Sequence, residues 1–143
     1  MNHKNIFPWI AMMEIPENYT TTEFSAQFYI EKSYLFVKLA GPWTADTALK
    51  SMQLIKVEAD KHEVRNILLD FTGMMRPENE MVRYYTGEYI ADVFKTSYRL
   101  SAYAQAFKIN RFAETVAVNR NANFRIFTDE KLARDWLLLN EIG

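Results

Sequence analysis

A short apolar run that ends in a turn signal is the feature that most constrains this fold. Residues 66–73 read Asn-Ile-Leu-Leu-Asp-Phe-Thr-Gly, and only Asp70 interrupts the hydrophobic side chains between Ile67 and Phe71. Such runs suit a β-strand that is covered on both faces, as in a parallel sheet flanked by helices. We therefore predict a central strand here. Asp70 to Gly73 would lie at its carboxyl end, where open α/β sheets place ligands and switches.

The composition indicates a single globular domain. The chain has 143 residues, of which 49% are hydrophobic and 24% are charged, and it is long enough to bury a core without cross-links. It contains no cysteine, which excludes disulfides, thiol catalysis and cysteine-ligated metal sites. The N-terminal region lacks a continuous apolar stretch, and no run approaches the length of a membrane span. We therefore expect a cytoplasmic protein with no stable membrane insertion.

Hydrophobic periodicity predicts a chain that alternates between strands and helices. Period-two alternation indicates an early antiparallel hairpin, and later apolar positions recur at helical spacing. In chain order, we predict strands at 23–30 and 34–40, a helix at 44–62, a strand at 66–71, a helix at 77–94, a strand at 101–107, a helix at 110–121, a strand at 124–127 and a last helix capped by Thr128. This order predicts a mixed, mainly parallel sheet of about five strands with four flanking helices. We assign residues 23–143 to one α/β domain and residues 1–22 to an irregular N-terminal segment.

The helix at 77–94 is rich in aromatic residues. Its buried stripe is predicted to contain Val82, Tyr85, Tyr89 and Val93. The two tyrosines either pack in the core, which is the commoner case, or line a pocket for a small apolar or lipid-like ligand. Gly87 weakens the helix by about 1 kcal/mol relative to alanine, and its small size suits close packing.

Two stretches of the chain, together with the order of its elements, point to a known family. The stretches are Leu-Leu-Asp-Phe-Thr-Gly at 68–73 and the ending at 124–137, which reads Phe-Arg-Ile-Phe-Thr-Asp and continues to Ala133 and Trp136-Leu137. Over roughly residues 23–140 the chain resembles the SpoIIAA-like branch of the STAS domains. These are relatives of the sporulation anti-sigma-factor antagonists and are sometimes grouped with lipid-binding Sec14-type folds. The resemblance implies a regulatory domain that acts through protein–protein contact.

The chain departs from this family at the loop after the central strand. Typical antagonists carry an Asp-Ser-Ser-Gly-type phosphorylation loop there. This chain has Thr-Gly-Met-Met-Arg at 72–76 and no serine between residues 70 and 79. The resemblance therefore does not bring the phosphoserine switch to this chain, and we do not transfer that role to Thr72.

Asp70 is the sharpest candidate for chemistry. An acid at the carboxyl end of a strand can bind a ligand or act as a base, but it can equally accept backbone N–H groups of its own turn. The structural role is the commoner one. The two histidines, His3 and His62, have no metal-ligand spacing, and His62 suits a helix C-terminus. We predict no catalytic residues, no metal and no cofactor.

Basic side chains are concentrated late in the chain. Residues 95–128 hold six lysines and arginines against the single acid Glu114. Such an excess can attract an anionic partner, or it can be a solvated face with acidic neighbours in space. Because the net charge of the whole chain is −1, we do not expect nucleic-acid binding. The candidate residues of a ligand or partner surface are Asp70, Thr72, Tyr85, Tyr89, Lys108, Arg111, Arg120 and Arg125.

Three functional hypotheses follow from these residues. The first is a non-catalytic regulatory or protein-interaction module of STAS type. The second is a carrier or sensor of a small apolar or anionic ligand, which would bind at the aromatic helix and the basic segment 95–128. An enzyme is the third.

The N-terminal segment predicts an oligomer. It contains Phe7, Trp9 and Ile10 without the periodicity of a packed element, and the hairpin after it is apolar or aromatic on both faces. An exposed apolar hairpin at the end of a sheet is usually covered. Either residues 1–22 cover it within the chain, or a second copy does so in a homodimer, which we favour.

Overall fold

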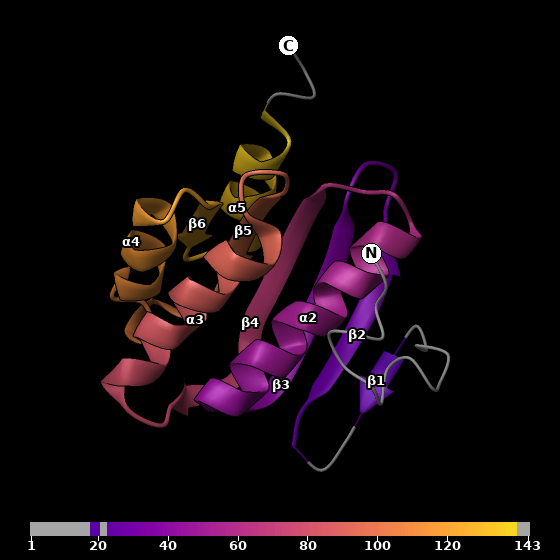
Figure 1. Cartoon of the computed structure of the whole chain (residues 1–143). Helices are drawn as coiled ribbons and strands as arrows, with labels where there is room; N and C mark the ends of the chain where they lie inside the picture. Colours follow the sequence, from indigo (N-terminus) through magenta and orange to yellow (C-terminus); the bar gives the residue numbers. More distant parts are fainter. Residues whose placement is uncertain (1–17, 21–22, 140–143) are drawn as a thin grey trace.

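The computed structural model describes residues 18–20 and 23–139, which form a six-stranded sheet with helices on both faces (Figure 1). The strands are β1 (Asn18–Thr20), β2 (Ser25–Ile30), β3 (Leu35–Trp43), β4 (Asn66–Pro77), β5 (Arg99–Tyr103) and β6 (Asn123–Phe127). The helices are α2 (Ala45–Lys61), α3 (Glu80–Phe94), α4 (Phe112–Asn119) and α5 (Glu130–Leu137), with a 3-10 turn, η2 (Ala106–Lys108), after β5. None of the helices within these residues is long and apolar enough to cross a membrane.

The sheet is mixed and mainly parallel, as the sequence predicted. Its strands lie in sequence order, β1 to β6. β1, β2 and β3 pair antiparallel, whereas β3, β4, β5 and β6 pair parallel. The additional strand is β1, which has three residues and lies within the segment that we expected to be irregular. The apolar residues Phe7, Trp9 and Ile10 lie outside the described residues.

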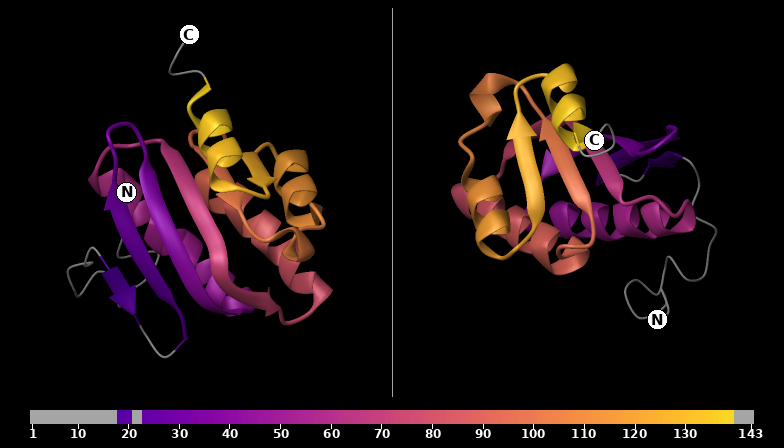
Figure 2. Two further views of the ribbon diagram at one scale, coloured as in Figure 1. Left: turned by 180° about the vertical axis from the view of Figure 1, so that it is seen from behind. Right: turned by 90° about the horizontal axis from the view of Figure 1, so that it is seen from above.

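Helices cover the two faces of the sheet unequally. α2, α3 and α4 lie on one face, and α5 lies on the other over β4, β5 and β6 (Figure 2). The large core lies under α2, α3 and α4 and includes Ile67, Leu69 and Phe71 of β4. Leu68 points the other way and packs against Leu137 of α5 in a smaller core. β4 is therefore buried on both faces, which confirms it as the central strand.

β4 is longer than we predicted. We expected it to end at Phe71 and a helix to begin at Pro77, but the strand runs to Pro77 and α3 begins at Glu80. The reason is β3, which continues past its own predicted end at residue 40 and pairs with β4 throughout. Two register shifts, each with one extra residue in β4, accommodate the irregular sequence. Gly41 lies between them with φ of 124°, a conformation that favours glycine.

β5 and the caps also differ in detail from the predictions. β5 ends at Tyr103 instead of residue 107, because the chain leaves the sheet and forms η2. The predicted N-cap Thr44 is confirmed, since its hydroxyl accepts the Thr47 N–H at 3.1 Å. The last helix is instead capped by Asp129, the residue after Thr128, whose carboxylate accepts the Leu132 N–H at 2.9 Å.

Gly87 lies where α3 packs against α4. A Cβ atom at this position would overlap the Ala113 carbonyl oxygen and lie 2.9 Å from Val116 Cβ. The predicted need for a small residue is therefore confirmed: the two helix backbones approach too closely for any side chain.

We expect Gly87→Ala to destabilise the fold although alanine favours helix by about 1 kcal/mol. The forced separation of α3 and α4 should outweigh that gain and lower the free energy of unfolding by about 1–3 kcal/mol. Urea denaturation measures it, with Asp92→Ala on the exposed side of α3 as the control. Equal or higher stability of Gly87→Ala would contradict the close approach.

Candidate functional site

The site that the sequence singled out is the end of β4. The last pair between β4 and β5 is Asp70–Tyr103. Beyond it, residues 71–77 of β4 pair only with β3 among the described strands, and we call them the β4 overhang. The backbone polar groups on the other edge of the overhang need partners, because unpaired buried groups are costly.

Asp70 stabilises the start of the overhang. Its Oδ1 atom accepts the Thr72 N–H at 2.8 Å and the Thr72 hydroxyl at 2.6 Å. These bonds lie at the first register shift, where Phe71 and Thr72 face the single residue Leu39. The side chain is largely buried, at 9% exposure. This arrangement favours the structural role over a role in binding or catalysis.

Tyr103 lies opposite Asp70 at the end of β5. Burial, together with the neighbouring Asp70 carboxylate, raises the pKa of Tyr103. Its phenol is protonated at neutral pH, as in any tyrosine, and can donate a hydrogen bond. Sequence reasoning missed this tyrosine, because its position opposite Asp70 depends on a parallel register that no local pattern encodes.

Lys108 takes the place of a neighbouring strand along the β4 overhang. Its ammonium group donates to the Thr72 carbonyl at 3.1 Å and also to the Met74 carbonyl. The Gln105 amide adds a second donor to the Thr72 carbonyl at 3.1 Å. Lys108 is only 7% exposed, and burial lowers its pKa, with Arg76 acting in the same direction. The Lys108 ammonium group thus provides hydrogen bonds to backbone carbonyls of β4.

The three candidate arginines lie in different surroundings. At the start of α4, the Arg111 guanidinium lies 3.0 Å from the Glu114 carboxylate. Past the other end of that helix, Arg120 lies 3.2 Å from Glu88 of α3. Arg125 belongs to β6, and its guanidinium lies 5.4 Å from the Phe127 ring centroid. The basic segment of the sequence therefore does not form a single cationic patch.

The aromatic residues of α3 form a surface cluster. We use the name aromatic face for Tyr84, Tyr85 and Tyr89 of α3 with Phe112 of α4. Tyr85 and Tyr89 stack with ring centroids 6.2 Å apart, and Tyr84 lies 5.6 Å from Tyr85 and 6.4 Å from Phe112. The three tyrosines are half-buried, and Phe112 is 39% exposed.

The buried side of α3 matches the predicted stripe in part, since Val82 is buried and Tyr89 and Val93 pack, partly buried, against the large core. Its buried residues are Val82, Thr86, Gly87, Ile90, Ala91 and Phe94. The sequence placed Tyr85 and Tyr89 there because they are large and mainly apolar. The helix buries small residues such as Thr86 and Gly87 together with Ile90 and Phe94, since it packs against both α2 and α4. The Thr86 hydroxyl accepts the Trp43 indole N–H at 2.9 Å.

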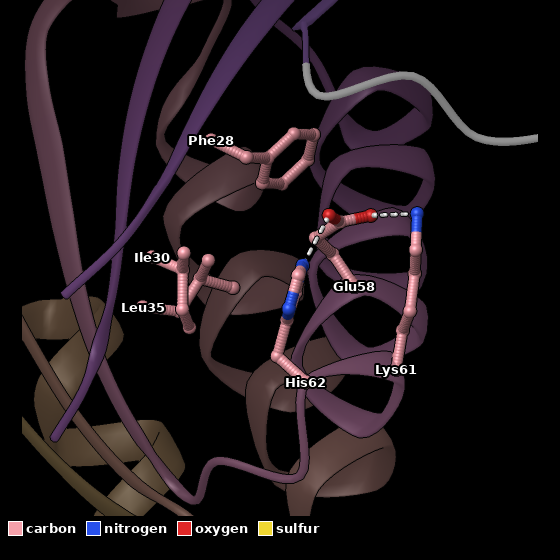
Figure 3. A pocket seen from close by; sticks show the side chains of 6 residues that line it. All are labelled: Phe28, Ile30, Leu35, Glu58, Lys61 and His62. Atoms are coloured by element: carbon pink, nitrogen blue, oxygen red, sulfur yellow. Dashed lines mark hydrogen bonds and ion pairs between the residues drawn. The ribbon is translucent and has the colours of Figure 1, made fainter. Parts of the chain in front are cut away.

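Among the described residues, the cavities coincide with the predicted ligand surface only where Lys108 and Arg111 line one small cavity. Two small ones, near Trp43 and Phe71 beneath α3, measure about 10 Å³ each, which is close to the minimum for one water. A larger cavity of about 190 Å³ lies at the end of α2 (Figure 3). Its lining residues are Phe28, Ile30, Leu35, Glu58, Lys61 and His62.

Sequence reasoning found only one residue of the larger cavity, His62, which caps the C-terminus of α2 as expected of a helix-end histidine. The signal that could have found its polar side is Glu58, an acid one turn before His62 and next to the apolar stripe of the same helix. Across residues 18–20 and 23–139 there is no cluster of three side chains suited to hold a metal ion.

We expect Asp70→Asn to lower the free energy of unfolding by about 1–2 kcal/mol, because the largely buried carboxylate accepts two hydrogen bonds from Thr72. Chemical denaturation measures it, and Asp92→Asn on the exposed side of α3 is the matched control. An unchanged midpoint, accompanied by loss of a bound ligand, would instead assign Asp70 to binding.

Lys108→Met should be more severe. The substitution keeps the aliphatic stem but leaves the Thr72 and Met74 carbonyls without the ammonium donor, and we expect a loss of at least about 2 kcal/mol. The control is Lys131→Met, whose side chain is 78% exposed in a surface ion pair and should have little effect. Equal stability of the two variants would show that Lys108 is not needed to support the overhang.

Comparison with known proteins identifies the fold. No protein-family model matches this sequence, and the comparison with curated proteins found no match. An uncharacterised protein of the DUF3478 family from Shewanella loihica PV-4, described as having a SpoIIAA-like fold, superposes with a TM-score of 0.54. It is 20% identical, and the match covers 83% of this chain and 98% of that one.

A second solved structure agrees. An anti-sigma factor antagonist from Mycobacterium paratuberculosis superposes with a TM-score of 0.57 at 7% identity, over 82% of this chain and 97% of that one. Both proteins are matched over nearly their whole length, with TM-scores above 0.5. The chain therefore has the SpoIIAA-like fold of the STAS domains, as the two sequence stretches at 68–73 and 124–137 implied.

Proposed function

We propose that this protein is a non-catalytic regulatory module of STAS type that binds a protein partner through the aromatic face. The observation that carries the proposal is the cluster of three half-buried tyrosines and an exposed phenylalanine on neighbouring helices. Tyrosine and phenylalanine are enriched in protein interfaces, and tyrosine is common among the residues that dominate binding energy.

The surroundings of the aromatic face suit an interface. Met81 and Val118, on the same two helices, are 51% and 48% exposed and add apolar surface. The Arg120 guanidinium donates to the Tyr84 hydroxyl at 2.8 Å and pairs with Glu88. Paired charges of this kind hold the tyrosine in place and supply a polar rim to an apolar centre.

A regulatory role without catalysis fits the end of β4. The two buried ionisable side chains there, Asp70 of β4 and Lys108 of η2, are both hydrogen-bonded to the backbone of the strand. The position of the usual phosphorylation loop holds Thr72, whose hydroxyl donates to Asp70. The matched protein from M. paratuberculosis is named an anti-sigma factor antagonist, and we infer a role of the same kind here, by contact with a partner and without a phosphoserine switch.

A second candidate function is the binding of a small ligand. We first assigned this role to the aromatic helix and to the basic segment 95–128. The observation that favours it is the 190 Å³ cavity at the end of α2, which lies away from both. Native mass spectrometry of the purified chain separates the two functions, since a bound small molecule supports the second.

The aromatic face can be tested by replacing Tyr85 and Tyr89 together with serine. After affinity capture from the native organism, we expect the amount of partner bound to the tagged variant to be at least tenfold lower than the amount bound to the wild type. The reason is that two side chains that anchor the interface are lost. The readout is quantitative mass spectrometry of the captured proteins, with unfolding curves to show that the variant is folded.

The matched control is Tyr29→Ser, which removes a tyrosine of β2 that is 38% exposed on the face of the sheet opposite α2. Unchanged capture by the Tyr85/Tyr89 variant would contradict the aromatic face. Loss of capture with Tyr29→Ser instead would move the interface to the hairpin. Light scattering of the same proteins tests the predicted homodimer, since the partner could be a second copy of this chain.

A further inference from the structure

The cavity at the end of α2 has a polar side and an apolar side. The apolar side is formed by Phe28 and Ile30 of β2 and by Leu35 of β3. Glu58, Lys61 and His62 face them from the last turn of α2 and its C-cap (Figure 3). The mouth is open, since Ile30 is 45% exposed and the Lys61 side chain 48% exposed.

Glu58 is buried at the polar side without full hydrogen bonding. Its side chain is 2% exposed, and its Oε2 atom lies 3.1 Å from His62 Nε2. The Oε1 atom is buried and accepts no hydrogen bond from the residues that the structure describes. Lys61 lies 3.9 Å from this oxygen, too far for a hydrogen bond. A buried carboxylate normally has its oxygens satisfied, so this one has capacity for a further donor.

We propose that this cavity binds a small organic amine, with its ammonium group on the Glu58 carboxylate and its apolar body against Phe28, Ile30 and Leu35. A carboxylate bordered by apolar walls favours a cation that carries hydrocarbon. The size agrees, because a cavity of roughly 150 Å³ in an engineered protein is enough to hold benzene. The binding site lies on α2 and the hairpin and is separate from the aromatic face.

Lys61 acts as the competitor of the ligand. Its ammonium group forms a long ion pair with the oxygen that the amine would use, and its flexible side chain extends to the surface. An incoming amine replaces this long pairing with a direct hydrogen bond to Glu58. Removal of the lysine charge should therefore strengthen amine binding, whereas removal of the glutamate charge should weaken it.

The probe is benzylamine, added to the full-length chain and followed by ligand-observed NMR and by isothermal titration. Benzyl alcohol and phenylacetate serve as the neutral and the anionic analogues. We expect benzylamine to bind at least tenfold more tightly than benzyl alcohol, and phenylacetate not to bind. Equal binding of the amine and the alcohol, or no binding of benzylamine, would overturn the proposal.

The variants Glu58→Gln and Lys61→Gln have expected effects of opposite sign. Glu58→Gln should weaken benzylamine at least tenfold, and Lys61→Gln should strengthen it severalfold. General destabilisation cannot produce that pair of changes. The matched control is Glu23→Gln, which removes an exposed carboxylate paired with Lys50 and should leave binding unchanged.

If Glu58→Gln does not fold, the variant Ile30→Trp tests the same cavity by filling it. Ile30 lies at the mouth, and its half-exposed position can accept a larger ring that fills the cavity. We expect this variant to remain folded and to lose benzylamine binding. Retained binding, or weaker binding in Lys61→Gln, would show that the amine does not occupy this cavity.

Discussion

The backbone N–H and C=O groups of β4 need hydrogen-bond partners on both edges of the strand, and the two neighbouring strands cover different lengths of it. The rest of the domain depends on how the uncovered groups find partners. β3 accompanies β4 to Pro77, whereas β5 leaves it at Asp70. The missing partner is supplied by two side chains, Lys108 and Gln105, which reach back from η2 to the carbonyl groups. The position of η2 is thereby tied to the strand, and with it the start of α4 and the way α4 packs on α3.

The sequence predicted those parts of the fold that depend on local patterns. The apolar run of β4, the alternation in β2 and β3 and the cap at Thr44 are each encoded within a few neighbouring residues. The extension of β4 could not be predicted, because Gly-Met-Met-Arg-Pro has the composition of a loop and becomes strand only through pairing with β3. The roles of Lys108 and Tyr103 likewise depend on which strands lie side by side.

The candidate functional residues show the same limit. The closeness of these arginines in the sequence suggested one basic surface. However, Arg111 and Arg120 lie at opposite ends of α4. Because side chains alternate along a strand, Arg125 of β6 lies on the face of the sheet that α5 covers. Size and hydrophobicity suggested that Tyr85 and Tyr89 are buried, whereas both are half-buried and the close approach of α4 places Gly87 inward. The cavity at Glu58 joins a helix end to a hairpin, and no single stretch of sequence contains both.

The side chains that lie along the β4 overhang also limit how this sheet can grow. An open strand edge is a template on which another extended chain can pair, as in aggregation or in peptide recognition by strand addition. Here the Thr72 carbonyl, which an incoming strand would need as a hydrogen-bond acceptor, already accepts from Lys108. The buried Lys108 side chain also occupies the place of such a strand. The centre of the sheet is therefore protected against intermolecular strand pairing. Any partner at this end of the molecule has to recognise the side chains of its helices instead of its main chain.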